Sequence, residues 1–185
     1  MIKNARHTLT YDSQVIFETV VDGQQGIAII EKGHYYFTEG RLRQLITHNE
    51  TYYATNLAVA KRLAHDILGS AHAAPYFFSD LVWVPLEVHN RSVMIYVALH
   101  QIGRIRSITK DTTMLELHHG IKVLLNMSVH SVYKRLLVSC VLKTLLDVRK
   151  KFLYEAVSHG KPGFEIIKEQ GNVFYTKKRD EKADD

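Results

Sequence analysis

The chain has 185 residues, of which 46% are hydrophobic and 23% charged, an ordinary composition for a globular domain with a hydrophobic core. No apolar run approaches the ~20 residues needed to span a bilayer. The opening sequence, MIKNARHTLTYDS, lacks the apolar stretch of a signal peptide. The single cysteine, Cys140, excludes an internal disulfide. These features predict a cytoplasmic protein without a membrane anchor.

Positive charge is concentrated in the middle of the chain. The net charge is +5, but residues 61–151 carry thirteen basic and six acidic side chains, a net of +7. Residues 88–110 contain no Asp or Glu and carry four basic side chains, Arg91, Arg104, Arg106 and Lys110. Such a patch favours a polyanionic partner. The alternative is a solvated basic face without a partner.

The first part of the chain predicts strands joined by tight turns. Residues 9–21, LTYDSQVIFETVV, are rich in β-branched and aromatic residues, and Asp22-Gly23 is a hairpin turn signal. Residues 26–33, GIAIIEKG, predict a second strand, and residues 34–40, HYYFTEG, a short third one. Residues 42–53, LRQLITHNETYY, form too short a run for periodicity to decide between helix and strand.

A short helix is predicted over residues 55–69, TNLAVAKRLAHDILG, because apolar residues recur at helical spacing and Gly69 stops the pattern. Its polar side carries Lys61, Arg62 and His65.

Buried strands are predicted next. Residues 76–88, YFFSDLVWVPLEV, and residues 92–102, SVMIYVALHQI, have the length and composition of buried strands. Pro85 cannot donate to a strand ladder, so it places its strand at a sheet edge or ends it there.

The sequence LELHHGIKVLLNMS can be interpreted as a metal site or as a hairpin. We favour a strand, a tight turn at His118-His119-Gly120 and a return strand, with Gly120 supplying a positive φ. Ser128 is then the expected N-cap of a long helix. The predicted packing stripe of this helix contains Val129, Val132, Tyr133, Leu136, Leu137, Cys140, Val141 and Leu145.

These elements predict an α+β fold: a mostly antiparallel β-sheet with a short mid-chain helix and a long C-terminal helix. Residues 1–160 are expected to form one β-rich domain. Residues 161–185 are expected to form a charged, disordered tail.

The residues give little support for catalysis or metal binding. Adjacent histidines on a strand point to opposite faces, and zinc needs three or four ligands. No nucleophile elbow, phosphate-binding loop or dinucleotide-binding motif is present. Cys140 falls on the predicted packing stripe, where a cysteine is inert. We therefore expect no catalytic residue, no metal and no cofactor, although an enzyme without a recognisable motif stays a possible alternative.

The middle segment resembles the ComK family, the competence transcription factors of Gram-positive bacteria, over residues 36–143. Four pieces carry the resemblance: NLAVAKRLAHDILG; HAAPYFFSDLVWVPLEV; Arg91 leading into MIYVALHQIGRI; and LELHHGIKVLLNMS followed by VHSVYKRLLVSCVLK. The chain departs from the family pattern at Ala73, where the family has lysine, at Leu86, where it has threonine, and at His119, where it has asparagine.

The resemblance implies a sequence-specific DNA-binding activator of DNA-uptake genes. It implies recognition of paired A/T-rich boxes, largely through the minor groove, by a homo-oligomer that is a dimer or larger on DNA. An adaptor protein that delivers the factor to a protease reads the family's C-terminal segment, loosely matched here by GFEIIKEQ. Nucleoid-associated localisation follows from DNA binding.

Arg104 and Arg106 fit insertion into a narrow minor groove, because they are two residues apart in an acid-free segment. The full set of expected DNA contacts is Lys61, Arg62, Arg91, Arg104, Arg106, Lys110, Lys122, Lys134 and Arg135. The run Val93 to Leu99 and the long helix offer extra apolar surface for self-association. The main alternative is a β-rich protein–protein module whose basic face binds an acidic partner.

Overall fold

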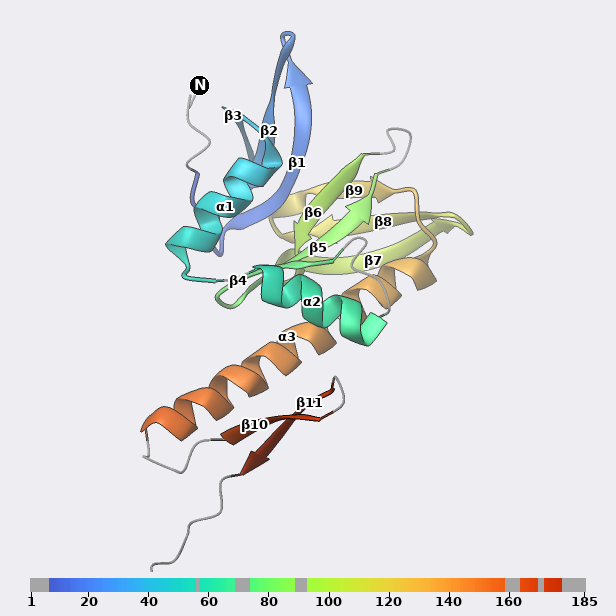
Figure 1. The fold of residues 1–185 in the computed structure, drawn as a ribbon. Helices are drawn as coiled ribbons and strands as arrows, with labels where there is room; N and C mark the ends of the chain where they lie inside the picture. Colours follow the sequence, from blue (N-terminus) through green and yellow to red (C-terminus); the bar gives the residue numbers. More distant parts are fainter. Residues whose placement is uncertain are drawn as a thin grey trace, which may run out of the picture. The chain divides into compact units, whose positions relative to one another are not determined.

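The computed structural model describes residues 7–55, 57–68, 74–88, 93–158, 164–169 and 172–177 (Figure 1). These residues belong to two compact units, Met1–Lys143 and Thr144–Asp185. All strand pairs among them are antiparallel. The predicted α+β class is therefore confirmed, and the structure adds a second short helix.

The larger sheet of the first unit, sheet A, has the strand order β3-β2-β1-β6-β5-β4. Its strands are β1 (Ser13–Val21), β2 (Gln24–Glu31), β3 (His34–Glu39), β4 (Tyr76–Phe78), β5 (Leu81–Glu87) and β6 (Met94–Ala98). The predicted turn at Asp22-Gly23 is confirmed, with φ values of 51° and 75°. Lys32-Gly33 repeats this geometry at 50° and 79°. Two successive positive φ values fit the right-handed twist of the strands that they join.

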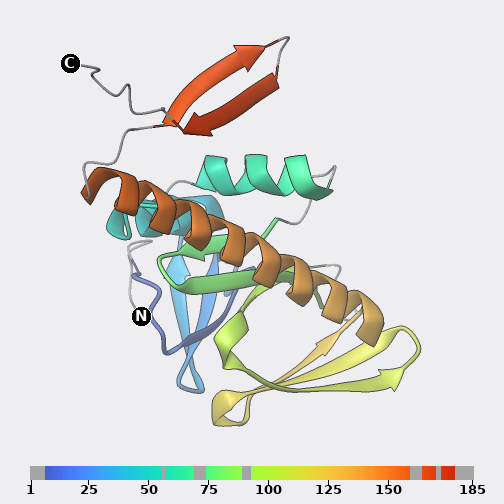
Figure 2. The same ribbon diagram turned by 90° about the horizontal axis from the view of Figure 1, so that it is seen from below.

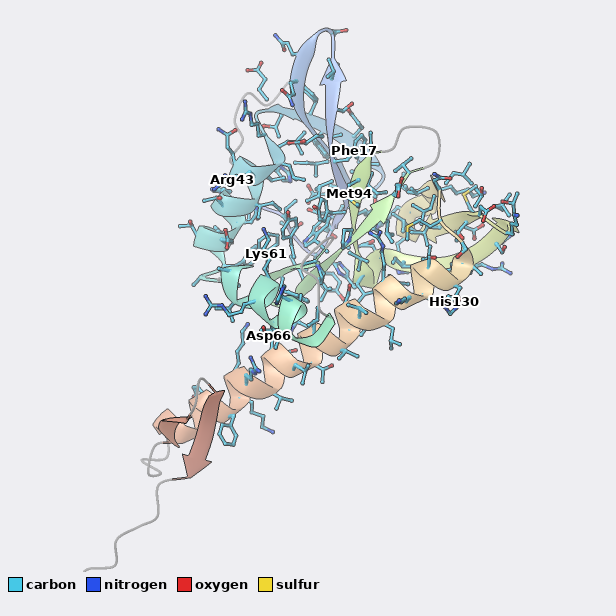
Figure 3. All side chains as sticks on the ribbon, turned by 45° about the vertical axis from the view of Figure 1, so that its right-hand side comes forward. Phe17, Arg43, Lys61, Asp66, Met94 and His130 are labelled. Carbon is cyan, nitrogen blue, oxygen red and sulfur yellow. The ribbon has the colours of Figure 1, made fainter. Side chains whose placement is uncertain are left out.

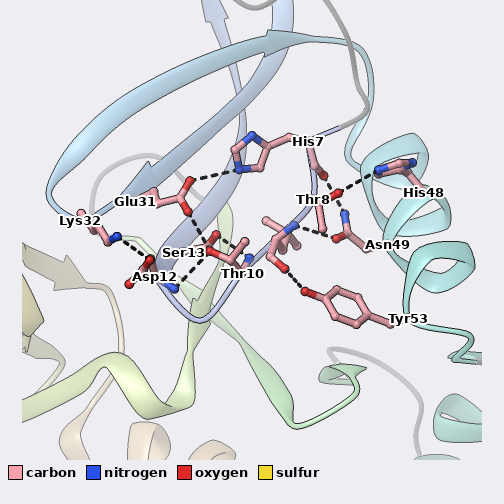
Figure 4. A network of polar contacts seen from close by, with 11 residues as sticks. His7, Thr8, Thr10, Asp12, Ser13, Glu31, Lys32, His48, Asn49 and Tyr53 are labelled. Atoms are coloured by element: carbon pink, nitrogen blue, oxygen red, sulfur yellow. Dashed lines mark hydrogen bonds and ion pairs between the residues drawn. The ribbon is translucent and has the colours of Figure 1, made fainter.

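Residues 42–53, which the sequence left undecided, form helix α1 (Leu42–Tyr52). Its Leu45 packs in a core with Leu9, Ile16 and Trp83. The buried Asn49 accepts a hydrogen bond from Leu9 N at 2.8 Å and donates to His7 O at 3.0 Å (Figure 4). These tertiary contacts fix the helix where periodicity alone is ambiguous.

The start of α1 is stabilised by a side chain from sheet A. Glu18 of β1 accepts a hydrogen bond from Leu42 N at 2.8 Å. A carboxylate at this position satisfies one of the free N–H groups and interacts favourably with the helix dipole.

The predicted mid-chain helix is confirmed as α2 (Leu57–Leu68), which contacts β4. Its Leu63 and Ala64 are buried, whereas Lys61, Arg62 and His65 are exposed, as the amphipathic pattern predicts.

A second, three-stranded sheet in the same unit, sheet B, has the order β7-β8-β9. After a 3₁₀ turn at Leu99–Gln101 it comprises β7 (Ile102–Thr109), β8 (Thr112–Leu117) and β9 (Lys122–Leu125). A bridge between Val88 and Leu125 and a hydrogen bond from Asn126 N to Glu87 O at 2.9 Å join it to β5. The two sheets thus meet at the end of β5.

Helix α3 (Val129–Ser158) begins in the first unit and ends in the second. Ser128 is its N-cap as predicted, because its Oγ accepts a hydrogen bond from Ser131 N at 3.2 Å. The first turns of α3 run beside sheet B (Figure 2).

The predicted packing stripe of α3 is wrong for most of its members. Among the α3 side chains that the structure describes, Val132, Ser139 and Leu142 are buried, whereas Tyr133, Leu137, Val141 and Cys140 are exposed. Cys140 is therefore not a core residue. Apolar residues occur on several sides of this helix, so composition does not select one face. Ser139 tolerates burial because its hydroxyl donates to Arg135 O at 2.8 Å.

The prediction that Pro85 places its strand at a sheet edge or ends it there is wrong. Strand β5 continues through it to Glu87 and is not the outermost strand. However, β4 pairs only with Leu81–Trp83, so no strand in the described part of the chain pairs with Pro85 on that side. Its carbonyl instead accepts a hydrogen bond from Arg135 Nη1 at 2.8 Å. The missing N–H of proline is thus tolerated at a locally unpaired position.

In the second unit, β10 (Phe164–Glu169) pairs with β11 (Asn172–Lys177). This hairpin differs from the disorder expected for residues 161–185. The expectation was based on the charged residues at the end of the chain. The segments FEIIKE and NVFYTK also contain β-branched and aromatic residues, which favour strands. Residues 178–185 lie outside the described part of the chain.

Candidate nucleic-acid interface

Sheet B presents three basic side chains on one exposed face. Arg104 and Arg106 are two residues apart on β7, where no register shift separates them, and residues two apart on a strand share a face. Arg104 lies opposite Glu116, which in turn lies opposite Lys122. We call Arg104, Arg106 and Lys122 the basic face. The other side of sheet B carries Leu115, Leu117 and Leu125, all buried.

One carboxylate lies within the basic face. Arg106 Nε is 3.3 Å from Glu116 Oε1, and Arg106 Nη2 is 3.4 Å from Glu116 Oε2. This two-pronged pair is solvent-exposed, with 48% of the Arg106 side chain accessible. Among the described residues, Arg104 makes no ion pair. Residues 88–110 contain no acidic side chain, but the neighbouring strand β8 places the carboxylate of Glu116 beside them.

Lys110 lies at the tip of the β7–β8 hairpin, and 90% of its side chain is exposed. Asp111, the next residue, is 3.9 Å away. An exposed pair at this distance is worth at most about 1 kcal/mol, so Lys110 stays available to a ligand.

The structure does not bring the other predicted contacts onto the basic face. Lys61 and Arg62 lie on α2, which is apart from β7–β9 (Figures 2 and 3). Lys134 is exposed on α3. Arg135 is half-buried, and its guanidinium is held by Pro85 O at 2.8 Å and Met94 Sδ at 3.8 Å. Arg91 lies outside the described residues.

The turn at His118–Gly120 joins β8 to β9, as the hairpin interpretation predicts. His119 has a φ of 59° and Gly120 a φ of 77°. His118 and His119 are both exposed. No group of three or more His, Cys, Asp or Glu side chains within the described ranges could hold a metal ion.

Sequence reasoning missed the buried Gln14, which ties this turn to sheet A. Gln14 Nε2 donates to His118 O, and its Oε1 accepts from Gly33 N at 2.8 Å. Next to Gly33, Lys32 Nζ is 2.7 Å from Asp12 Oδ2. The hydrogen bond to Asp12 and the charge of that carboxylate raise the pKa of Lys32. No sequence signal identifies such a glutamine, because its partners come from three distant segments.

A groove of about 700 Å³ adjoins the basic face, between β1, β2 and β6 on one side and β9 on the other. Its lining is mostly apolar and includes Val15, Phe17 and Ile95, with Lys122 at one side. Glu18 also borders it, but its carboxylate is hydrogen-bonded to the start of α1.

No helix in the described part of the chain is long and apolar enough to cross a membrane.

Comparison with known proteins gives a match to a protein family. The family model described as "ComK protein" matches residues 12–151, well over half of the chain, including sheets A and B and most of α3. No curated protein and no solved structure matches significantly. The chain therefore belongs to the ComK family, a family of competence transcription factors rather than of enzymes.

Proposed function

We propose that this protein activates competence genes by binding A/T-rich duplex DNA, and that β7 of sheet B enters the minor groove. The observation that carries the proposal is the placement of Arg104 and Arg106 on one exposed strand face, with Lys122 two strands away on the same face. The minor groove is about 6 Å wide and is strongly negative in A/T-rich tracts, where arginine is the usual guest.

The proposal requires Arg106 to exchange Glu116 for DNA. An exposed ion pair is worth about 0.2–1 kcal/mol, whereas a direct arginine contact to DNA is worth about 1–3 kcal/mol. The exchange is therefore favourable, and Glu116 acts as a weak internal competitor.

Some predicted contacts that lie outside the basic face are proposed as phosphate contacts at most. They are Lys110, Lys134, and Lys61 with Arg62 on α2. Such contacts add affinity without sequence preference. Arg135 is assigned to the fold, because its guanidinium is already bonded to the backbone of β5.

Self-association on DNA is a further part of the proposal. The apolar run Val93 to Leu99 offers little surface for self-association, since Ile95, Val97 and Ala98 of the central strand β6 are buried in the fold. The exposed Tyr133, Leu137 and Val141 of α3 now support it. Light scattering of the saturated DNA complex tests it, and a single protomer per duplex would contradict it.

The adaptor–protease interaction also stays a proposal. The segment GFEIIKEQ that suggests it contains strand β10. Deletion of residues 164–185 is expected to lengthen the protein's lifetime in cells, which pulse-chase measurement checks.

The second candidate is a protein–protein module whose basic face binds an acidic partner. The Arg106–Glu116 pair favours it, because it shows that this face accommodates a carboxylate. Fluorescence anisotropy with A/T-rich and G/C-rich duplexes of equal length separates the two functions. DNA binding with A/T preference supports the transcription factor, whereas equal and weak binding of both duplexes favours the protein module.

A further inference from the structure

The turn at His118–Gly120 is an ordered, exposed structure. Leu117 N donates to Ile121 O at 2.8 Å and closes the turn, while His119 and Gly120 adopt positive φ values. Both imidazoles are exposed. The turn therefore presents two histidines to solvent in a defined place.

A buried hydrogen-bond network holds the turn from below. Gln14 is fully buried and bonds both His118 O and Gly33 N. Its Nε2 also donates to Gln101 Oε1 at 3.4 Å, and Gln101 donates to Tyr11 O at 2.7 Å. A satisfied buried network of this kind rigidifies the groups that it connects.

Cationic and imidazole side chains lie near the turn. Lys32 and His34 flank Gly33, where an added Cβ would be 3.5 Å from His119 O. His100 stacks on Tyr11, with ring centroids 3.9 Å apart. The nearby carboxylates are engaged, Asp12 with Lys32 at 2.7 Å and Glu116 with Arg106 at 3.3 Å. Glu31, opposite His34 in the sheet, is 3.3 Å from His7 Nε2 and accepts a hydrogen bond from Thr10 Oγ1 at 2.8 Å. Lys122 begins the following strand.

The turn lies close to the basic face along the sheet. Glu116, the partner of Arg104, is two residues before His118, so a rise of ~3.3 Å per residue separates the turn from the level of Arg104 by roughly 7 Å along the sheet. The minor groove is about 6 Å wide, and its walls are the phosphate backbones. With an arginine inside the groove, a group at this separation is within reach of a backbone phosphate.

We infer that the His118–Gly120 turn, with Lys32 and His34 beside it, is a second DNA contact that binds backbone phosphate and strengthens when the histidines are protonated. The inference rests on the proposed function and adds a pH dependence to it. Histidine is the side chain that ordinarily changes charge between pH 5 and 8. Protonation adds positive charge beside phosphate, so affinity for DNA rises as the pH falls.

The test measures Kd for an A/T-rich duplex at pH 6 and pH 8, with wild-type protein and with the double variant His118→Gln/His119→Asn. Asparagine suits the positive φ of residue 119. We expect wild type to bind on the order of tenfold more tightly at pH 6, which corresponds to two exposed charge pairs. The double variant should lose more than half of the gain at pH 6.

Two further variants sharpen the result. His130→Gln removes another exposed histidine, on the first turn of α3 (Figure 3), and should keep the full gain. His118→Lys fixes a positive charge and should tighten binding at pH 8. Circular dichroism at both pH values verifies folding.

The outcomes separate the inference from the proposed function. If wild type binds DNA without a gain at pH 6, or if the double variant retains the gain, the inference is wrong and the function stands. If the His130→Gln control loses the gain as well, the effect is not local and the inference is also wrong. Wild-type protein that binds no DNA at either pH would overturn both.

Discussion

Sheet B and the first turns of α3 each carry a pair of basic side chains, but the fold uses the two pairs differently. Arg104 and Arg106 lie on one face of strand β7, and both are exposed to solvent. On α3, Arg135 turns toward β5 and bonds Pro85 O, while Lys134 stays in solvent. Adjacent positive charges in a sequence therefore need not form one binding surface. The packing partner of each element decides which charge remains available.

The largest expected effect comes from the pair on β7. The double substitution Arg104→Ala/Arg106→Ala should reduce affinity for A/T-rich duplex at least tenfold, because each direct contact is worth about 1–3 kcal/mol. Preference over G/C-rich duplex should also disappear. The slope of log affinity against log salt should fall by roughly one unit for each phosphate that the variant no longer neutralises. Anisotropy titrations at several salt concentrations measure all three.

Circular dichroism and a thermal melt are the controls for this variant. A folded variant that keeps its A/T preference would show that another element reads the groove.

The next effect is on stability and concerns α3. Arg135→Met removes the charged donor to Pro85 O, and such a bond contributes about 1.5–3 kcal/mol. We expect the free energy of unfolding to fall by a comparable amount while the folded protein keeps its DNA affinity. Urea denaturation measures the change.

Lys134→Met is the matched control, since it changes an exposed neighbour and should alter stability by less than about 0.5 kcal/mol. Equal stability of the two variants, with DNA binding abolished only in Arg135→Met, would reverse the roles that we give to the two regions.

A smaller effect tests the competitor within the basic face. Glu116→Gln frees Arg106 and should tighten DNA binding by up to about fivefold, the equivalent of an exposed ion pair. Asp66→Asn on α2 makes the same change in net charge away from sheet B and should have less effect. If both variants tighten binding equally, net charge rather than the local pair is responsible.

The smallest effect is expected from Lys134→Ala. It should weaken binding to all duplexes alike by a few-fold at most, with a change of about one unit or less in the salt slope, as for a single phosphate contact. A selective loss of A/T-rich binding would place α3 in the groove.

Much of the fold could be predicted from local signals. Asp22-Gly23, His119-Gly120 and the Ser128 N-cap each mark a boundary that the structure confirms. These signals act over two to four residues, within reach of sequence reasoning. Helix α1 could not be predicted, because it depends on Leu45 and Asn49 finding partners in the N-terminal segment and the core.

The candidate site was predictable only in part. The basic residues of β7 were identified from their spacing, but the register that sets Glu116 beside Arg106 comes from strand pairing. The buried face of α3 was misjudged for a similar reason, since Val132 and Leu142 are chosen by their packing partners and not by periodicity. Information of this kind resides in pairs of distant residues.

Pro85 also bears on how the edge of β5 is protected against pairing with another chain. An open strand edge offers N–H and C=O groups to any passing chain, and natural proteins block such edges. At Pro85 the N–H does not exist, and Arg135 occupies the carbonyl. A strand from another molecule that approaches β5 next to the end of β4 would therefore find neither a free donor nor a free acceptor at Pro85. One arginine thus completes the protection that proline begins, and its loss would expose a hydrophobic sheet to intermolecular pairing at the high concentrations of expression or storage.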